Sequence, residues 1–217
     1  MSIAVFDLDY TLLAGDSDYA WGQFLIEHQI VDREEYRRRN DQYYADYQAG
    51  KLDIMDFLAF ALAPLAAHDR AQLDAWHRQY MQEKVLPMIT SDARALVEKH
   101  RTRGDTLIIA TSTNRFVTAP IAQEFGVENL IATDPEELNG RFTGKVHGTP
   151  SYREGKVARL REWLDRTGQS LAGSYGYSDS HNDLPLLDLV DHPVAVNPDP
   201  LLAKYAARAR WPIIRLH

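Results

Sequence analysis

The chain has 217 residues, and 24 Lys and Arg against 31 Asp and Glu give it a formal net charge of −7. With 45% hydrophobic and 25% charged residues it has the composition of a globular protein long enough to bury a core, which excludes collagen-like and disordered classes. The acidic balance argues against a binder of duplex nucleic acid, and no apolar run reaches the roughly 18 residues that a membrane span needs.

The absence of cysteine excludes disulfides, thiolate metal sites and a cysteine nucleophile. The first residues lack a basic flank and reach an acidic residue at Asp7, so we expect no secretory signal and a cytoplasmic protein.

The first predicted element is a strand at residues 3–6, where a short apolar run breaks into acidic residues. Similar runs at residues 107–110, 175–177 and 194–196 also break into polar residues. Such runs are typical of strands that are buried on both faces, as in a parallel sheet. Because helical patterns separate them, we expect an α/β fold with a doubly wound, Rossmann-like parallel sheet.

Residues 15–87 differ from the rest of the chain, because they contain no strand-like run and carry apolar residues at helical spacing. A helical block of this length between two core strands exceeds an ordinary crossover connection. We therefore expect a helical cap at residues 15–87, inserted into a core that consists of residues 1–14 and 88–217. The tyrosines at positions 36, 43, 44 and 47 have helical spacing, and we interpret them as packing between the cap helices.

Further helix-start signals follow in the rest of the chain: Asp32 within the cap, then Thr90 or Ser91, a capping-box pair at Ser151 and Glu154, and Asp199 before Pro200. The helices that begin near residues 90 and 154 are expected to end at Gly104 and Gly168. Asn139 and Gly140 predict a tight β-hairpin at residues 137–146.

Asp7 and Asp9 directly follow the first predicted strand. In an extended chain their side chains project to the same side, with Cα atoms roughly 7 Å apart. Two carboxylates placed in this way repel each other unless a cation lies between them or one takes a proton. A solvated acidic turn is the alternative, but ligands of open α/β sheets bind at the carboxyl ends of strands, which favours a functional role.

Polar residues follow or precede other predicted elements in the same manner. Thr111 and Ser112 follow the second predicted strand, and their hydroxyls suit phosphoryl oxygens, although a helix N-cap is the alternative. Lys156 lies in the first turn of a helix, where positive charge is unfavourable, and a surface lysine is the alternative. Asp179 and Asp183 open a helix after the third predicted strand, where one carboxylate can bind a metal while the other orients it.

Taken in this order, the four motifs resemble those of the haloacid dehalogenase superfamily over essentially the whole chain. The matches are Asp7-Leu8-Asp9-Tyr10-Thr11 in the first motif, Thr111 in the second, Lys156 in the third, and Asp179 with Asp183 in the fourth. The insertion between the first and second motifs is similar to that of the branch containing phosphoserine phosphatases and histidinol-phosphatase-like enzymes. The second and fourth motifs depart from the glycine-containing forms typical of phosphoserine phosphatases.

The resemblance implies a Mg²⁺-dependent phosphomonoesterase whose catalytic residues are Asp7, Asp9, Thr111 and Lys156. Asp7 would attack phosphorus to form an aspartyl-phosphate, and Asp9 would protonate the leaving alkoxide and then activate water. Thr111 and Lys156 would hold the phosphoryl oxygens.

The resemblance also implies the metal ligands. Mg²⁺ would be held by Asp7, Asp179 and the backbone carbonyl of Asp9, with waters and phosphate completing the shell. Asp183 would hydrogen-bond either to Lys156 or to a water on the metal.

A helical cap that closes over the phosphate favours a small phosphorylated metabolite, similar to phosphoserine or histidinol phosphate. Asp16 lies nine residues beyond Asp7, where phosphoserine phosphatases place an acid that binds the substrate amine, and the alternative role is a helix N-cap. Asp18 and Ser112 are further candidate substrate contacts. A receiver-type phospho-acceptor domain and a phosphotransferase on the same fold are the alternative functions.

Overall fold

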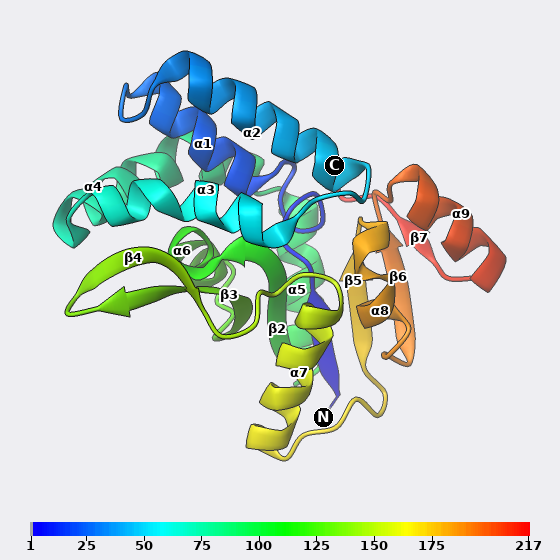
Figure 1. Cartoon of the computed structure of the whole chain (residues 1–217). Helices are drawn as coiled ribbons and strands as arrows, with labels where there is room; N and C mark the ends of the chain where they lie inside the picture. The colour runs from blue at the N-terminus through cyan, green and yellow to red at the C-terminus, as the bar shows by residue number, and fades with distance from the viewer. Residues whose placement is uncertain (1) are drawn as a thin grey trace.

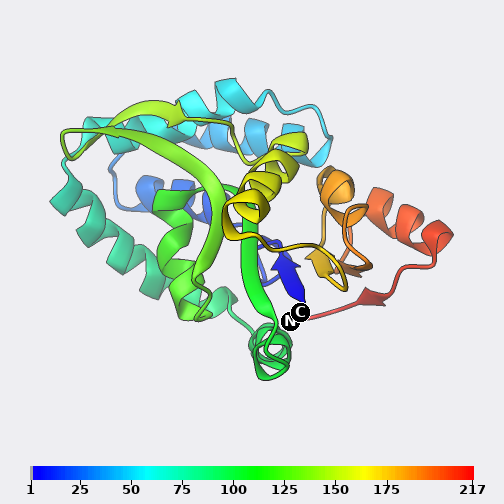
Figure 2. The same cartoon turned by 90° about the horizontal axis from the view of Figure 1, so that it is seen from below.

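The computed structural model describes residues 2–217, which form a seven-stranded sheet with helices on both faces (Figures 1 and 2). The strands are β1 (Ile3–Phe6), β2 (Thr106–Asn114), β3 (Asn129–Leu138), β4 (Arg141–His147), β5 (Tyr175–Ser178), β6 (His192–Val196) and β7 (Ile213–Ile214). Their order in the sheet is β4-β3-β2-β1-β5-β6-β7, and each neighbouring pair is parallel except β3 with β4. The predicted α/β class with a largely parallel sheet is confirmed.

The helices are α1 (Ser17–Glu27), α2 (Arg33–Gln48), α3 (Ile54–Ala67), α4 (Arg70–Tyr80), α5 (Ser91–Thr102), α6 (Arg115–Glu124), α7 (Glu154–Thr167), α8 (Leu184–Leu187) and α9 (Pro200–Ala209). A π turn at Met81–Val85 and 3₁₀ turns at Leu86–Met88 and His181–Asp183 complete the set. Helices α1 to α4 follow one another without an intervening strand and gather above the end of the sheet toward which β1 points (Figure 1). This helical segment lies within the expected cap at residues 15–87.

The chain enters and leaves this helical segment through two neighbouring stretches. Leu13 forms an isolated antiparallel bridge with Ile89, and the Ala14 N–H donates to the Met88 carbonyl oxygen at 2.8 Å. The two chain connections between the helical segment and the sheet therefore lie side by side.

Strand β1 is buried on both faces, and its alternate side chains belong to different cores. Phe6 packs in a core with Val97 of α5, whereas Val5 packs in a second core with Leu160 of α7. Figure 2 shows α5 and α7 on opposite sides of the sheet. The uninterrupted apolar run at residues 3–6 follows from this double coverage.

Most of the predicted helix starts are observed. The side chains of Asp32, Thr90 and Asp199 accept backbone N–H groups at the starts of α2, α5 and α9. The predicted capping box at Ser151 and Glu154 is wrong, because the Ser151 hydroxyl has no hydrogen-bond partner among residues 2–217. The Ser151 N–H instead donates to the Thr133 hydroxyl at 3.0 Å, and Arg153 precedes α7 with a positive φ of 49°.

The predicted hairpin is observed between β3 and β4. Asn139 and Gly140 have φ values of 52° and 76°, as a two-residue turn with positive φ at both positions requires. Strand β2 extends past the predicted residues 107–110 and includes Thr111, Ser112 and Thr113, with an irregular register against β3.

Strand β1 lies at the point where the strand order reverses, between β2 and β5. In doubly wound sheets this switch point opens a crevice at the carboxyl ends of the strands. Asp7, directly after β1, is therefore placed at the entrance of that crevice. No helix within residues 2–217 is both long and apolar enough to cross a membrane.

Candidate active site

Asp7 is anchored in the sheet and buried beneath the cap helices. Its N–H donates to the Tyr177 carbonyl oxygen at 2.8 Å, which continues the pairing of β1 with β5. One carboxylate oxygen lies 3.0 Å from the Lys156 Nζ. Burial raises the pKa of Asp7 to about 7 despite the opposing attraction of Lys156.

Lys156, in the first turn of α7, is only 2% exposed. Its Nζ donates to the Asp183 carboxylate at 2.7 Å as well as to Asp7, and the Ser178 hydroxyl donates to Asp183 at 2.8 Å. Burial alone would lower the pKa of Lys156, but Asp183 and Asp7 raise it above its usual value. The lysine is therefore a buried cation between two carboxylates, and Lys156 is the partner that Asp183 takes in this structure.

Asp179, directly after β5, approaches Asp7 through the hydroxyl of Thr11. That hydroxyl accepts the Asp179 N–H at 3.0 Å and lies 3.3 Å from the Asp179 Oδ1 and 3.5 Å from the Asp7 Oδ2. Burial, followed by the charges of Asp7 and Asp183, raises the pKa of Asp179 well above its usual value. Two carboxylates from distant parts of the chain therefore meet around one hydroxyl.

Both carboxylate oxygens of Asp9 are held by hydrogen bonds. The Ser17 N–H donates to Oδ1 at 2.6 Å, and the Thr113 hydroxyl donates to Oδ2 at 2.9 Å. Burial and the charge of Asp16 raise the pKa of Asp9 to about 7 against these bonds. The sequence reasoning missed the contact of Thr113 with Asp9, although residues 111 and 113 share one side of an extended strand.

These groups open into a single cavity with about 690 Å³ of empty space, part of it open to solvent. It is lined by Asp7, Asp9, Tyr10, Asp16, Asp18, Tyr19, Asn40, Tyr43, Tyr44, Tyr47, Leu52, Ile54, Phe57, Thr111, Ser112, Thr113, Tyr152 and Asp179.

Asp16, Asp18, Thr111 and Ser112, which the sequence reasoning named as candidate site residues, all line the cavity. Asp16 accepts the Tyr19 N–H at 2.8 Å and caps α1, so the alternative interpretation of Asp16 as an N-cap is confirmed. Asn114, directly after the Thr111–Thr113 stretch, caps α6.

The cap tyrosines pack between cap helices, as expected, at three of the four positions. Tyr36 and Tyr43 pack on Phe60 of α3, with ring centroids 4.4 and 5.1 Å away, and Tyr44 packs on Tyr19 of α1 at 5.1 Å. Tyr47 packs instead on Tyr152, and the sequence reasoning missed that Tyr43, Tyr44 and Tyr47 also line the cavity. With Asn40 they occupy positions i, i+3, i+4 and i+7 of α2, which share one helix face. The spacing was visible in the sequence, but the direction in which this face points was not.

Magnesium fits the donors that the cavity presents. No group of three or more His, Asp or Glu side chains in residues 2–217 is arranged to hold a metal ion. Mg²⁺, however, commonly takes one or two carboxylates and completes its shell with water and substrate phosphate. Asp7 and Asp179 offer two converging carboxylates, and oxygen is the ligand type that Mg²⁺ prefers.

Comparisons with known proteins assign the chain to a family. The profile of the haloacid dehalogenase-like hydrolases matches residues 4–188. The chain is 46% identical to a histidinol-phosphatase of Neisseria meningitidis serogroup C (strain 8013) over 217 residues, which cover 98% of each protein. It is 32% identical to the phosphoserine phosphatase SerB1 of Mycobacterium tuberculosis over 216 residues, covering 97% of this chain and 69% of that protein.

Solved structures agree with the fold. A protein of unknown function from Bordetella pertussis Tohama I superposes with a TM-score of 0.94 at 47% identity, covering 100% of this chain and 99% of that one. A phosphoserine phosphatase in the form of a phospho-aspartyl intermediate analogue superposes with a TM-score of 0.72 at 15% identity, covering 100% and 93%. The chain therefore belongs to the haloacid dehalogenase-like hydrolase family, and its relatives place it among the phosphatases of that family.

Proposed function

We propose that the protein is a Mg²⁺-dependent phosphomonoesterase that hydrolyses a small phosphorylated metabolite through an aspartyl-phosphate on Asp7. The observation that carries this proposal is the convergence of Asp7, Asp9, Thr111 and Asp179 in one cavity, with Lys156 in contact with Asp7. Phosphoserine-like and histidinol-phosphate-like substrates are the types that the relatives' names suggest.

Asp7 is proposed as the nucleophile because it lies at the carboxyl end of the central strand and its carboxylate is held in place from one side. Lys156 contacts one oxygen at 3.0 Å, which leaves the other oxygen available for attack. The same ammonium attracts the negative charge that spreads over the phosphoryl oxygens in the transition state. The Thr111 hydroxyl, at the cavity wall, is a further donor to those oxygens.

Asp9 is proposed as the general acid and base. Its pKa near 7 allows it to hold a proton for the leaving alkoxide and then to accept one from water at neutral pH. The fixed contacts from Ser17 and Thr113 orient both oxygens, so that little rearrangement precedes proton transfer.

The proposed metal ligands are Asp7, Asp179 and the backbone carbonyl of Asp9. Bound there, Mg²⁺ would shield the negative charges of nucleophile and phosphate from each other. The Thr11 hydroxyl lies within 3.5 Å of both carboxylates and so holds them on the same side of the site. Asp183 contacts Lys156 and Ser178, so we propose that it positions the lysine.

A receiver-type phospho-acceptor domain is disfavoured, because the matched family consists of hydrolases. A phosphotransferase on the same fold is the second candidate. Adding an alcohol acceptor such as ethanolamine during turnover distinguishes a hydrolase from a phosphotransferase, because a phosphotransferase would form the new phosphoester faster than it releases free phosphate.

Hydrolysis of p-nitrophenyl phosphate tests the proposal. We expect turnover with Mg²⁺, loss of turnover with EDTA, and none in Asp7→Asn. Asp9→Asn should lose turnover of alkyl phosphates, because their alkoxide leaves only with a proton. From the activated ester p-nitrophenyl phosphate it should accumulate a phosphorylated enzyme that intact-protein mass spectrometry detects. Asp92→Asn, at an exposed site in the first turn of α5, is the control and should retain activity. Full activity in folded Asp7→Asn would overturn the nucleophile assignment.

A further inference from the structure

The cavity carries charge of only one sign. It is lined by five aspartates, whereas none of its lining residues is Arg, Lys or His. Lys156 lies next to Asp7, but its ammonium is paired with Asp7 and Asp183. The proposed function uses Asp7, Asp9 and Asp179 for the metal and the phosphoryl group. Asp16 and Asp18 are therefore left to face the rest of the substrate.

Of these two carboxylates, Asp18 is the one without a hydrogen-bond donor among the residues that the structure describes. Asp16 accepts the N–H of Tyr19 at the start of α1, but Asp18 accepts no hydrogen bond from any residue that the structure describes. Burial raises the pKa of Asp18 well above its usual value, and the charges of Asp16 and Asp9 raise it further. A cation at this place would stabilise all three carboxylates.

One wall of the cavity is aromatic and apolar. Tyr43 donates its hydroxyl to Asp56 at 2.6 Å, and the hydroxyls of Tyr10 and Tyr44 bond to each other at 2.6 Å. The Tyr43 hydroxyl hydrogen is used and the Tyr10–Tyr44 pair keeps only one free, so the rings are the larger part of what these tyrosines offer to a ligand. Phe57 and Tyr47 add to this wall. Aromatic rings attract cations and pack against flat or apolar bodies.

The arginines close to the cavity are committed to other contacts. The guanidinium of Arg39 lies 4.7 Å from the ring centroid of Phe60, in a separate groove of the cap. Arg153 donates to the Gly50 carbonyl oxygen at 2.7 Å and to Asn182 at 3.0 Å. A carboxylate on the leaving group would therefore meet aspartates without a positive partner.

We propose that the enzyme selects phosphomonoesters of amino alcohols that carry a protonated amine and no carboxylate, with Asp18 as the main counter-ion of the amine. Asp16 contributes its remaining oxygen, and the tyrosine face of α2 packs against the apolar or aromatic body. This inference rests on the proposed function, because it places the phosphate beside Asp7. It favours a histidinol-phosphate-like substrate over a phosphoserine-like one.

The first test compares phosphoethanolamine with phosphoserine, which differ only by the carboxylate. We expect kcat/KM to be at least about tenfold higher for phosphoethanolamine, and higher still for histidinol phosphate, whose imidazole fills the aromatic wall. Equal or higher kcat/KM for phosphoserine would overturn the inference. Failure to hydrolyse p-nitrophenyl phosphate with Mg²⁺ would instead overturn the proposed function.

The second test is Asp18→Asn, with Asp92→Asn as the matched control. Both residues lie in the first turn of a helix, so both substitutions remove a similar interaction with the helix N-terminus. We expect Asp18→Asn to raise KM for histidinol phosphate about 10- to 100-fold, and to lower its kcat/KM relative to p-nitrophenyl phosphate by about tenfold or more. Asp92→Asn should leave this ratio unchanged.

A thermal unfolding curve accompanies each variant, and the wild-type substrate panel decides the matter if Asp18→Asn does not fold. Equal losses on amine and neutral substrates in folded Asp18→Asn would show a structural role only and overturn the assignment.

Discussion

Replacing Lys156 by methionine tests how the buried carboxylates are stabilised. Methionine keeps the apolar stem and removes the charge that lies 3.0 Å from Asp7 and 2.7 Å from Asp183. At an effective dielectric constant of about 20, each contact is worth about 6 kcal/mol, against which stands the cost of burying the lysine. Removing one partner of a buried ion pair costs about 3–5 kcal/mol, so we expect Lys156→Met to lose this much free energy of unfolding.

The free energy of unfolding that Lys156→Met loses should depend on pH, because the buried carboxylates titrate. The pKa of Asp7 in the folded protein is already raised to about 7, and losing Lys156 raises it further. A carboxylate with a raised pKa takes up a proton in the folded state before the unfolded state does, so stability increases as the pH falls from above the folded pKa toward about 4. The deficit of Lys156→Met should therefore be larger at pH 9 than at pH 6.

Urea unfolding in EDTA at both pH values measures the deficit. Lys204→Met, at an exposed position of α9, is the control and should change stability by less than about 0.5 kcal/mol. The double variant Asp7→Asn/Lys156→Met should be more stable than Lys156→Met alone, because asparagine needs no counter-ion. A deficit below about 0.5 kcal/mol at pH 9 would refute the role given to Lys156.

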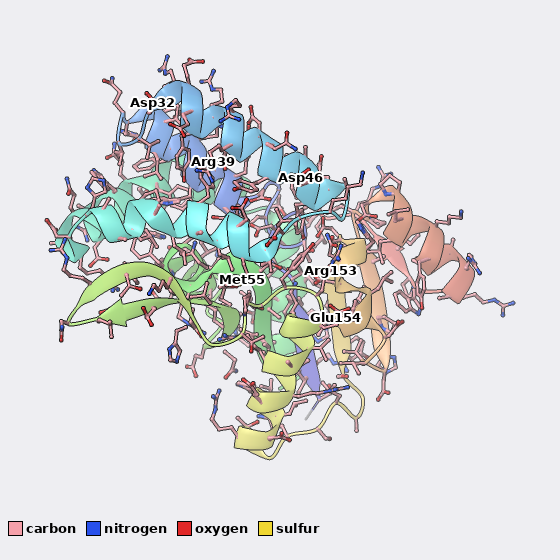
Figure 3. All side chains as sticks on the ribbon, in the orientation of Figure 1. Asp32, Arg39, Asp46, Met55, Arg153 and Glu154 are labelled. Atoms are coloured by element: carbon pink, nitrogen blue, oxygen red, sulfur yellow. The ribbon has the colours of Figure 1, made fainter. Side chains whose placement is uncertain are left out.

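Three further predictions follow from individual contacts. Thr113→Val removes the hydroxyl that donates to Asp9, which should raise the pKa of Asp9. The pH–rate profile of kcat should therefore shift by about one unit toward higher pH. Arg153 lies beside Glu154 at the start of α7 (Figure 3), and its guanidinium joins the Gly50 carbonyl to Asn182. Arg153→Lys loses this forked contact, which should raise KM about tenfold and expose the connection between α2 and α3 to proteolysis. Burial lowers the pKa of His100. As the pH falls below about 6.5, the unfolded state therefore protonates His100 before the folded state does, and the folded protein loses stability. Urea unfolding between pH 7.5 and 5.5 should show a smaller loss of stability in His100→Gln than in the wild type.

Each of these predictions can fail independently. An unchanged pH–rate profile in Thr113→Val would remove that residue from the positioning of Asp9. An unchanged KM and proteolysis pattern in Arg153→Lys would mean that the contact with Gly50 does not hold the cap. Parallel stability curves for His100→Gln and the wild type would show that His100 does not titrate on unfolding.

The sequence predicts the centre of the fold better than its edges. The runs at residues 3–6 and 107–110 are apolar because both faces of these strands are covered, and this signal needs no knowledge of the partners. Strand β7, with two residues, is too short to leave such a signal. The early part of β3 was also missed, since its apolar residues 130–132 pass into a polar half that belongs to the hairpin.

The residues of the candidate site also divide into those that the sequence predicts and those that it does not. Asp7 and Asp179 directly follow β1 and β5, and Thr111 lies in β2 beside β1, so strand order alone makes them neighbours. Tyr43 and Tyr47 could not be assigned, because the helical period gives one face of α2 without saying what that face meets. Ser151 fitted a local capping pattern, but the longer-range contact with Thr133 decided its conformation.

The chain enters and leaves the helical segment at neighbouring points, Leu13–Ile89 and Ala14–Met88, so the tyrosine face of α2 and the carboxylates that follow β1 and β5 belong to different stretches of chain. Under the proposed function, substitutions along α2 would alter which alcohol is accepted while the groups that act on the phosphate keep their positions. One set of phosphate-handling residues would then serve different phosphomonoesters.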